Sequence, residues 1–257
     1  MVCSLVQKVI WNRTDRGKKK KGNADGLGQI RAEELLKSAR KLGVRNDSDV
    51  FIVDDAERFP DSMQANWSAS DITSVLASAF APEFDHQEPS SSTSTKSRKR
   101  GTKKNTAAPV STIDALITFD RRGVSNHPNH RSLYHGAVHF LLGLMKDKTG
   151  YTCPIALYTL TTTNILRKYL GLLDTPVTMI RGVLHTIMSM WSKDAPQKKS
   201  MDKETPGQMM FVSSVSEYLT AQSAMVNAHK SQMVWFRWGW ITIGRYMVVN
   251  DLRKQRI

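Results

Sequence analysis

The segment FDRRGVSNHPNHRSLYHG, residues 119–136, holds two histidines whose spacing suits chemistry. Proline is favoured at the first position of a helix, so Pro128 should begin a helix with His127 as its cap and His130 in its first turn. The two imidazoles then lie on one rim. A neutral imidazole is a common zinc ligand, and a second imidazole beside the metal can donate a proton or a hydrogen bond to a developing oxyanion. Asp120 could orient one ring as a carboxylate partner.

The histidine pair is weak evidence when it is taken alone. A chain with seven histidines contains a His-x-x-His pair by chance about one time in six. The ordinary alternative is a helix cap followed by a solvent-facing histidine. His229, a single histidine on a predicted helix, has the same ordinary interpretation. These alternatives stay open at the level of the residues.

The elements that must position these residues alternate between helices and compact apolar runs. The apolar spacing predicts helices at 29–44, 68–84, 128–146 and 163–174, and a last helix that carries His229 and leads into an aromatic tail; strands are predicted at 49–55, 113–120 and 155–162. This alternation predicts an α/β fold with a mostly parallel sheet between helices. Ligands bind beyond the carboxyl ends of such strands, where Asp54, Asp55 and Asp120 fall.

Charge and composition restrict the class of protein. The net charge is +14, but ten of the positive charges lie in two runs, at 18–21 and 96–104, within polar segments that cannot bury a core. We therefore expect 1–21, 85–111 and 192–209 to be disordered, and we expect no nucleic-acid partner. A basic protein that binds nucleic acid or acidic lipid remains the alternative. No apolar run is long enough for a membrane span, and residues 1–22 show no signal peptide.

Five segments, in order along the chain, resemble one family. They are GNADGLGQIRAEELLKSARKLGV, FIVDDAERFPDSM, DALITFDRRGVSNHPNH, LTTTNILRKYLGLLD and AQSAMVNAHKSQMVWFRWGWITIGRYM. Together they are similar to the N-acetylglucosaminyl-phosphatidylinositol de-N-acetylases of glycosylphosphatidylinositol anchor biosynthesis, within the LmbE-like zinc deacetylases. The resemblance implies a single Rossmann-like LmbE domain over 22–252, a glycolipid substrate and a membrane surface as partners, and a place on the cytoplasmic face of the endoplasmic reticulum membrane.

The resemblance also implies roles for individual residues. His130 would be a zinc ligand, His127 would polarise the substrate carbonyl or stabilise the oxyanion, and Asp120 would support the pair in catalysis. Three further residues match positions of the family pattern and would contact the substrate: Arg31, Asp54 and His229. The implied reaction is hydrolysis of the N-acetyl group of the glycolipid to acetate and a free amine.

One departure from the family pattern concerns its opening motif. The family begins with a strand that ends in an Ala-His-Pro-Asp-Asp-Glu type of motif, and this motif would supply the remaining zinc ligands and a carboxylate base. No segment of this sequence matches it, and the resemblance starts near Gly22. We therefore expect the N-terminal strand unit to be missing and activity to be impaired. An incomplete sequence and a non-catalytic homologue both remain open.

The aromatic stretch MVWFRWGWITIGRYMVV, residues 233–249, allows two interpretations. An apolar terminal helix usually packs on the sheet. Tryptophan and tyrosine beside arginine are also typical of a segment that lies at a membrane interface. The two interpretations are compatible if one face packs and the other meets lipid.

Overall fold

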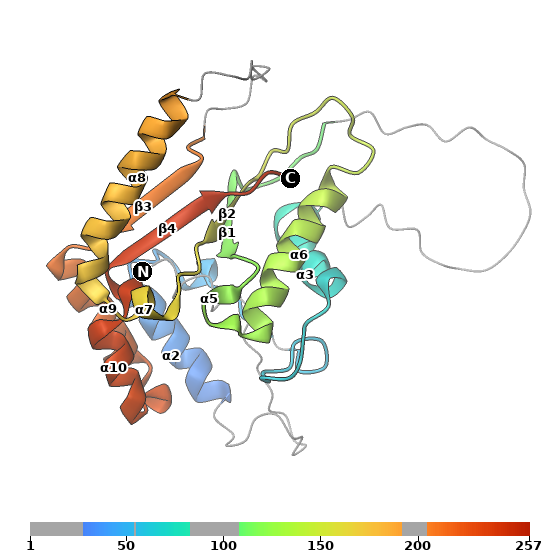
Figure 1. Ribbon diagram of the computed structural model, residues 1–257. Helices are drawn as coiled ribbons and strands as arrows, with labels where there is room; N and C mark the ends of the chain where they lie inside the picture. Colours follow the sequence, from blue (N-terminus) through green and yellow to red (C-terminus); the bar gives the residue numbers. More distant parts are fainter. Residues whose placement is uncertain (1–27, 54, 83–107, 192–204) are drawn as a thin grey trace, which may run out of the picture.

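The computed structural model describes residues 28–53, 55–82, 108–191 and 205–257 (Figure 1). The disorder expected for 1–21 and for most of 85–111 and 192–209 falls outside these ranges. The described helices are α2 (Gly28–Lys41), α3 (Ala69–Phe80), α5 (Gly123–Asn126), α6 (Pro128–Leu144), α7 (Ile165–Lys168), α8 (Asp174–Trp191), α9 (Val215–Ala228) and α10 (Trp235–Ile243). Short 3-10 turns are η1 (Asp47–Asp49), η2 (Gly171–Leu173), η3 (Lys230–Gln232) and η4 (Arg245–Met247).

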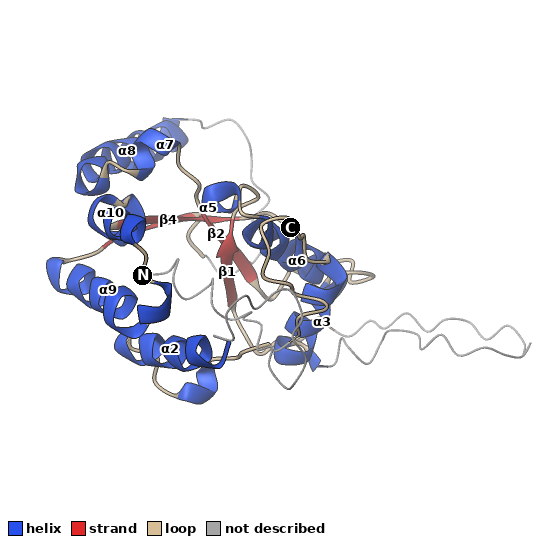
Figure 2. Cartoon of the chain, turned by 90° about the horizontal axis from the view of Figure 1, so that it is seen from below, coloured by secondary structure: helices blue, strands red, loops and turns tan. Residues whose placement is uncertain are grey.

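Four described strands form one sheet in the order β1-β2-β4-β3. They are β1 (Ala115–Phe119), β2 (Ala156–Leu160), β3 (Gln208–Val212) and β4 (Val249–Lys254). β1 and β2 are parallel, whereas β4 runs antiparallel to both β2 and β3. Helices lie on both sides of this sheet (Figure 2). The predicted α/β class is confirmed, but the expectation of a mostly parallel sheet holds only for β1 and β2 among the described strands.

α3 and α6 pack closely on the β1 side of the sheet. At Gly136 in α6, a Cβ atom would lie 2.4 Å from Ile72 of α3, so only glycine permits this approach. The buried residues shared by these helices and the neighbouring strands are Ala77, Ala81, Ala137, Phe140, Leu141, Leu144, Ile155 and Leu157. This core fixes the helix whose first turn carries the histidine pair.

A second core joins the two strand ends to the C-terminal part of the chain. Its buried members are Phe119, Val124, Tyr158, Leu160, Tyr246 and Leu252. The Tyr246 hydroxyl donates to the carbonyl of Thr161 at 3.0 Å and accepts from the amide of Thr163 at 3.1 Å. The chain that leaves β2 is therefore held in place by η4.

Several predicted elements differ from the observed ones. The strand predicted at 49–55 is not formed in 50–53, and none of the described strand pairings includes this segment. The single helix predicted at 163–174 is divided into α7, which ends at its C-cap Tyr169, and η2, which begins at Gly171 with a φ of 50°. The last predicted helix is α9, which ends just before His229, and the aromatic tail after it becomes α10 and β4. β3 begins at Gln208, inside the predicted insertion 192–209.

Candidate active site

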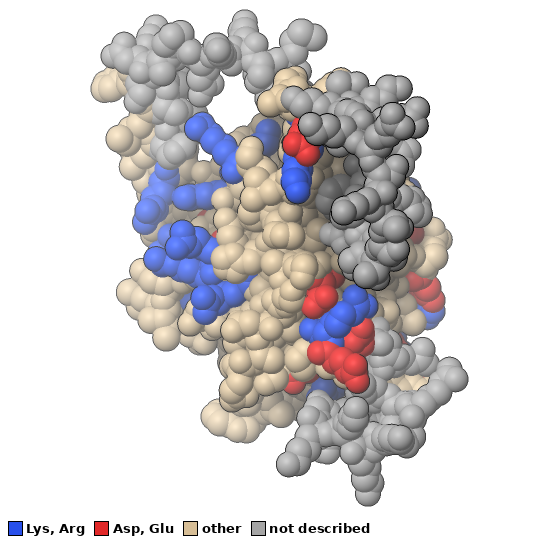
Figure 3. Space-filling view, turned by 90° about the vertical axis from the view of Figure 1, so that its right-hand side faces the viewer, with Lys and Arg blue, Asp and Glu red and all other residues tan. Residues whose placement is uncertain are grey.

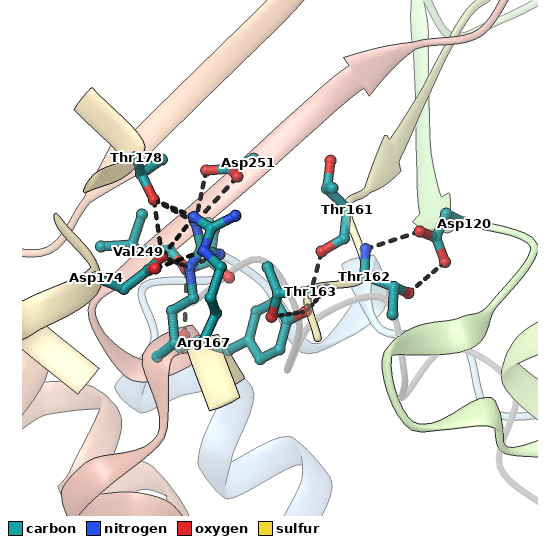
Figure 4. Close-up of polar contacts among 12 residues, drawn as sticks. Asp120, Thr161, Thr162, Thr163, Arg167, Asp174, Thr178, Val249 and Asp251 are labelled. Carbon is teal, nitrogen blue, oxygen red and sulfur yellow. Dashed lines mark hydrogen bonds and ion pairs between the residues drawn. The ribbon is translucent and has the colours of Figure 1, made fainter. Parts of the chain in front are cut away.

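Asp120 holds the carboxyl ends of β1 and β2 together. Its Oδ1 accepts from the backbone amides of Arg122 and Gly123 at 3.0 Å and from the Thr162 hydroxyl at 2.6 Å. Its Oδ2 accepts from the amide of Thr162 at 2.7 Å, as Figure 4 shows. Thr162 follows β2, so one carboxylate ties the loop after each parallel strand to the other.

The loop between β1 and α6 is strained. Gly123, Val124 and Asn126 all have a positive φ, at 62°, 63° and 59°. Such a φ is a real outlier for a β-branched residue such as Val124 and costs on the order of 1–3 kcal/mol. The Thr162 hydroxyl accepts from the Val124 amide at 2.9 Å, and the Val124 side chain is buried. Asp120 and Thr162 thus stabilise a backbone shape that the loop would not adopt alone.

His130 is buried in the first turn of α6. Its ring stacks on Phe119 with centroids 4.1 Å apart, and its Nδ1 lies 3.0 Å from the carbonyl of Gly123. A carbonyl only accepts, so Nδ1 carries the proton and Nε2 keeps its lone pair. Burial lowers the pKa of His130 to about 4 despite that hydrogen bond, and the charges of His127 and Lys168 add to the lowering. His130 is therefore neutral near pH 7, in the tautomer of a metal ligand with a backbone partner.

His127 is in the opposite tautomer. It is the N-cap of α6, as predicted, and its Nδ1 accepts from the Asn129 amide at 3.2 Å. In the neutral ring the proton must then lie on Nε2, so this imidazole presents a donor. The centroids of His127 and His130 are 5.0 Å apart. One ring thus offers a lone pair and its neighbour offers an N–H, which suits a ligand beside a hydrogen-bond donor.

The described residues only partly fit the zinc site that the resemblance implies. His130 has the tautomer, burial and backbone partner of a ligand, but no group of three or more candidate ligands occurs among the described residues. The hydrogen bonds described for Asp120 come from Arg122, Gly123 and Thr162, and none of them comes from either imidazole. It therefore positions the pair through the loop.

Two other predicted residues lie on α2 and at the end of α9, two elements that pack against each other. His229 is the buried C-terminal cap of α9, and Arg31 lies on α2. Glu34, one turn after Arg31, accepts from the Ser231 amide at 2.8 Å and so ties α2 to the segment after His229. Asp54, the remaining predicted substrate contact, lies outside the described residues. The structure groups Asp120, His127 and His130 at one strand end, and it places Arg31 and His229 on α2 and at the end of α9.

Several residues of the site were not predicted from the sequence. A Cβ on Gly123 would lie 2.8 Å from the Cβ of His130, so glycine is required for this approach. Thr162 and Phe119 complete the support of the loop and the ring. Burial lowers the pKa of Arg237, and the charge of Arg31 lowers it further. The sequence could have indicated Phe119 and Thr162 only by their position, because both lie at the ends of predicted parallel strands.

The fold and the site together define an α/β protein with a histidine pair at the carboxyl end of a parallel strand. The chain matches the family PIG-L, described as GlcNAc-PI de-N-acetylase, over residues 6–141, just over half of its length. It is 52% identical over 247 residues to the N-acetylglucosaminyl-phosphatidylinositol de-N-acetylase of Arthroderma benhamiae, covering 92% of this chain and 69% of the relative.

More distant relatives carry the same name. A probable de-N-acetylase of this kind from Schizosaccharomyces pombe is 30% identical over 236 residues, covering 91% of this chain and 71% of the relative. The Bos taurus enzyme is 31% identical over 231 residues, covering 90% and 68%. The chain belongs to the PIG-L family of GlcNAc-PI de-N-acetylases. The family match begins at residue 6, within the segment 1–21 that was expected to lie outside the domain.

Proposed function

We propose that this chain is an amide hydrolase that removes the acetyl group from N-acetylglucosaminyl-phosphatidylinositol, the second step of glycosylphosphatidylinositol anchor biosynthesis. Relatives of this name align with about nine tenths of the chain. The observation that carries the proposal is the pair of complementary tautomers at the end of β1. Metal-assisted hydrolysis of an amide uses both a ligand for an electrophilic metal and a donor for the developing oxyanion.

The chain's own residues supply the donor. Water adds to the carbonyl carbon of the acetyl group, the C–N bond breaks, and acetate and the amine are formed, the amine taking up the protons that the water loses. The Nε2–H of His127 would stabilise the negative charge that develops on the acetyl oxygen, or deliver a proton to the departing amine. His127 is held for this task because its Nδ1 accepts from the Asn129 amide, which fixes both the tautomer and the ring.

We propose zinc as the metal and His130 as one of its ligands. When bound, zinc polarises a carbonyl and makes a water molecule more acidic. Gly123 accepts from Nδ1 of His130 and leaves Nε2 available for coordination. The further ligands would come from the opening Ala-His-Pro-Asp-Asp-Glu type of motif of the family, which no segment of this sequence matches.

Arg31, Asp54 and His229 are proposed contacts of the glycolipid. The two described members lie where α2 meets the end of α9, close to a second arginine, Arg237. Cationic side chains suit a phosphodiester headgroup. A glycolipid substrate also requires approach to a membrane, and we propose the cytoplasmic face of the endoplasmic reticulum as the place of the reaction.

Two substitutions separate the roles of the histidines. His130→Ala should lose both bound zinc and acetate release, because a direct ligand is removed. His127→Ala should retain zinc and release acetate more slowly by about 10²- to 10⁴-fold. Zinc content after dialysis and acetate release from the glycolipid are the two measurements. His139→Ala, on the same helix and hydrogen-bonded to Thr73, is the control and should change neither.

Two results would contradict these assignments. Undiminished zinc in His130→Ala would remove this residue from the metal site. Failure of the unsubstituted protein to release any acetate with zinc present would indicate a non-catalytic homologue.

A further inference from the structure

α7, α8 and α10 expose many large apolar side chains. Those that are more than two fifths exposed are Ile165, Leu166, Val177, Met179, Ile180, Val183, Leu184, Ile187, Met188, Trp191, Trp235, Phe236, Trp238 and Ile243. Exposure reaches 70% at Leu166, 85% at Trp235 and 86% at Trp191. Contiguous apolar patches of this kind mark sites of interaction with a protein or a membrane. We call these three helices, with η2 between them, the apolar face.

α8 contributes most of this face. Of its described side chains only Asp174 and Thr178, in the first turns, are buried, and most of those that follow are exposed. A helix that is apolar over most of its circumference is normally covered by protein or lipid. None of the helices in the described part of the chain is long and apolar enough to span a bilayer. α8 is about 27 Å long by its 18 residues, and its exposed apolar side chains suit a helix that lies along a surface.

The three helices form a continuous surface. The backbone at Gly171 in η2 packs against the carbonyl of Ile243 at the end of α10, where a Cβ would lie 3.1 Å from that oxygen. The Lys168 ammonium lies 5.6 Å from the centroid of the Trp240 ring and so joins α7 to α10. Figures 1 and 2 place α7, α8 and α10 on the side of the molecule away from α3 and α6.

The charges of the apolar face have one sign. Asp174 is the only acidic residue in α7, α8 and α10, and it is fully buried in ion pairs with Arg167 and Arg245. Lys168, Arg181 and Arg237 are the remaining cations of these helices, and Arg181 is exposed. On the opposite face, which carries α3 and α6, both acidic and basic side chains occur (Figure 3). A surface of exposed apolar and tryptophan side chains with only positive charge complements anionic lipid headgroups.

The apolar face begins where the candidate active site ends. Asp120 binds Thr162, and Asn164, two residues later, caps α7 by accepting from the Arg167 amide at 2.9 Å. The exposed Ile165 and Leu166 follow directly. The candidate active site and the apolar face are therefore only a few residues apart along the chain. A lipid whose acyl chains stay in a bilayer beneath this face could bring its headgroup to the strand-end loop.

We propose that the apolar face docks on the surface of an anionic lipid bilayer, with α8 lying in the interface. The proposal rests on the proposed function only in assuming a membrane-bound substrate. A second copy or a partner protein would not require the uniformly positive charge, nor the position of the face beside the site. Both interpretations of the aromatic stretch 233–249 apply to different residues of it. Trp235, Phe236 and Trp238 are exposed on the apolar face, whereas Ile241, Tyr246 and Met247 are buried in the protein.

Vesicle flotation tests the docking surface. The protein should float with vesicles of phosphatidylcholine and phosphatidylserine that contain no glycolipid, and less with phosphatidylcholine alone. Leu166→Glu and Ile180→Glu should each reduce binding by about tenfold or more, because an apolar contact is replaced by a repelled charge. Leu142→Glu is the matched control: Leu142 is 55% exposed on α6, on the opposite side, and its substitution should leave binding unchanged.

Three outcomes are informative. Equal flotation of Leu166→Glu, Ile180→Glu and Leu142→Glu would overturn the proposal, as would failure of the unsubstituted protein to float. A dimer by light scattering that only the α7 and α8 substitutions dissociate, without vesicle binding, would assign the face to a second copy. Acetate release from a water-soluble, acyl-free substrate analogue tests the deacetylase function independently of bilayer docking. Neither Leu166→Glu nor Ile180→Glu should change this rate.

Discussion

Among single residues, the site depends most on the close contact between Gly123 and His130. Gly123→Ala places a Cβ 2.8 Å from the His130 Cβ and strains a residue with a φ of 62°. We expect acetate release to fall at least tenfold, because the loop must move and its carbonyl no longer orients the His130 ring. Stability should also fall, by about 1 kcal/mol or more. The measurements are kcat/KM and urea unfolding.

Gly150→Ala provides the control for backbone strain. Gly150 has a φ of 93°, but a Cβ atom there would meet no other atom within 4 Å, so alanine adds strain without a collision. Its unfolding free energy should fall while kcat/KM stays unchanged. Equal kcat/KM values for the two alanine variants would show that the approach of Gly123 to His130 does not matter for the reaction.

Among the helices and strands, a buried ionic cluster joins α7, α8, η4 and β4. Arg245 is fully buried, pairs with Asp174 and donates to the Asp251 carboxylate at 3.0 Å. Arg167 also pairs with Asp174, at 2.6 Å, and Figure 4 shows these contacts. Burial alone would raise the pKa of Asp174, but hydrogen bonds from Arg167, Arg245 and Thr178 outweigh it and lower the pKa. This cluster fixes the first turn of α8, from which the apolar face extends.

The lowered pKa of Asp174 predicts acid sensitivity. A carboxyl with a lower pKa in the folded state contributes stability above its unfolded pKa of about 4, and this contribution is lost as the pH falls through the folded value. Asp174→Asn should cost about 3–5 kcal/mol at pH 7, because Arg245 stays buried with one fewer partner, and the loss should shrink below pH 4. Urea unfolding across this range measures it. Asp47→Asn, in an exposed pair with Arg40, should change little at any pH, and an equal effect of both substitutions would refute the role of the cluster.

In the molecule as a whole, the C-terminal strand completes the sheet. β4 lies between β2 and β3 and pairs with both, and Val249, Asn250, Asp251 and Leu252 are buried. Removal of residues 249–257 should therefore yield insoluble or unfolded protein, because two strands lose their partner and expose unpaired edges. Circular dichroism and solubility are the measurements. Removal of only 256–257, both exposed, is the control, and a folded, soluble protein without β4 would contradict the prediction.

Local signals in the sequence were enough to predict part of the fold and part of the site. The apolar periods of α2, α3 and α6, the compact runs of β1 and β2, and Pro128 after a capping histidine each depend on neighbours within a few residues, and all were found. The tautomers of His127 and His130 required more, because they depend on which backbone groups the rings reach. The sequence was enough to identify the two histidines as candidates. Which ring nitrogen carries the proton was known only from the backbone groups that each ring contacts in the folded loop.

Features that join distant segments could be known only from the folded chain. β3 and β4 were not predicted, because a strand is stabilised by a partner far along the chain and their local residues also suit a polar loop or an apolar tail. The run at 49–55 has the composition of a strand, and 50–53 form none. Asp120 was expected beside the histidines but binds Thr162, 42 residues away, because the parallel pairing of β1 and β2 brings their ends together. The exposure of α8 was equally hidden, since an apolar helix looks the same in sequence whether protein or lipid covers it.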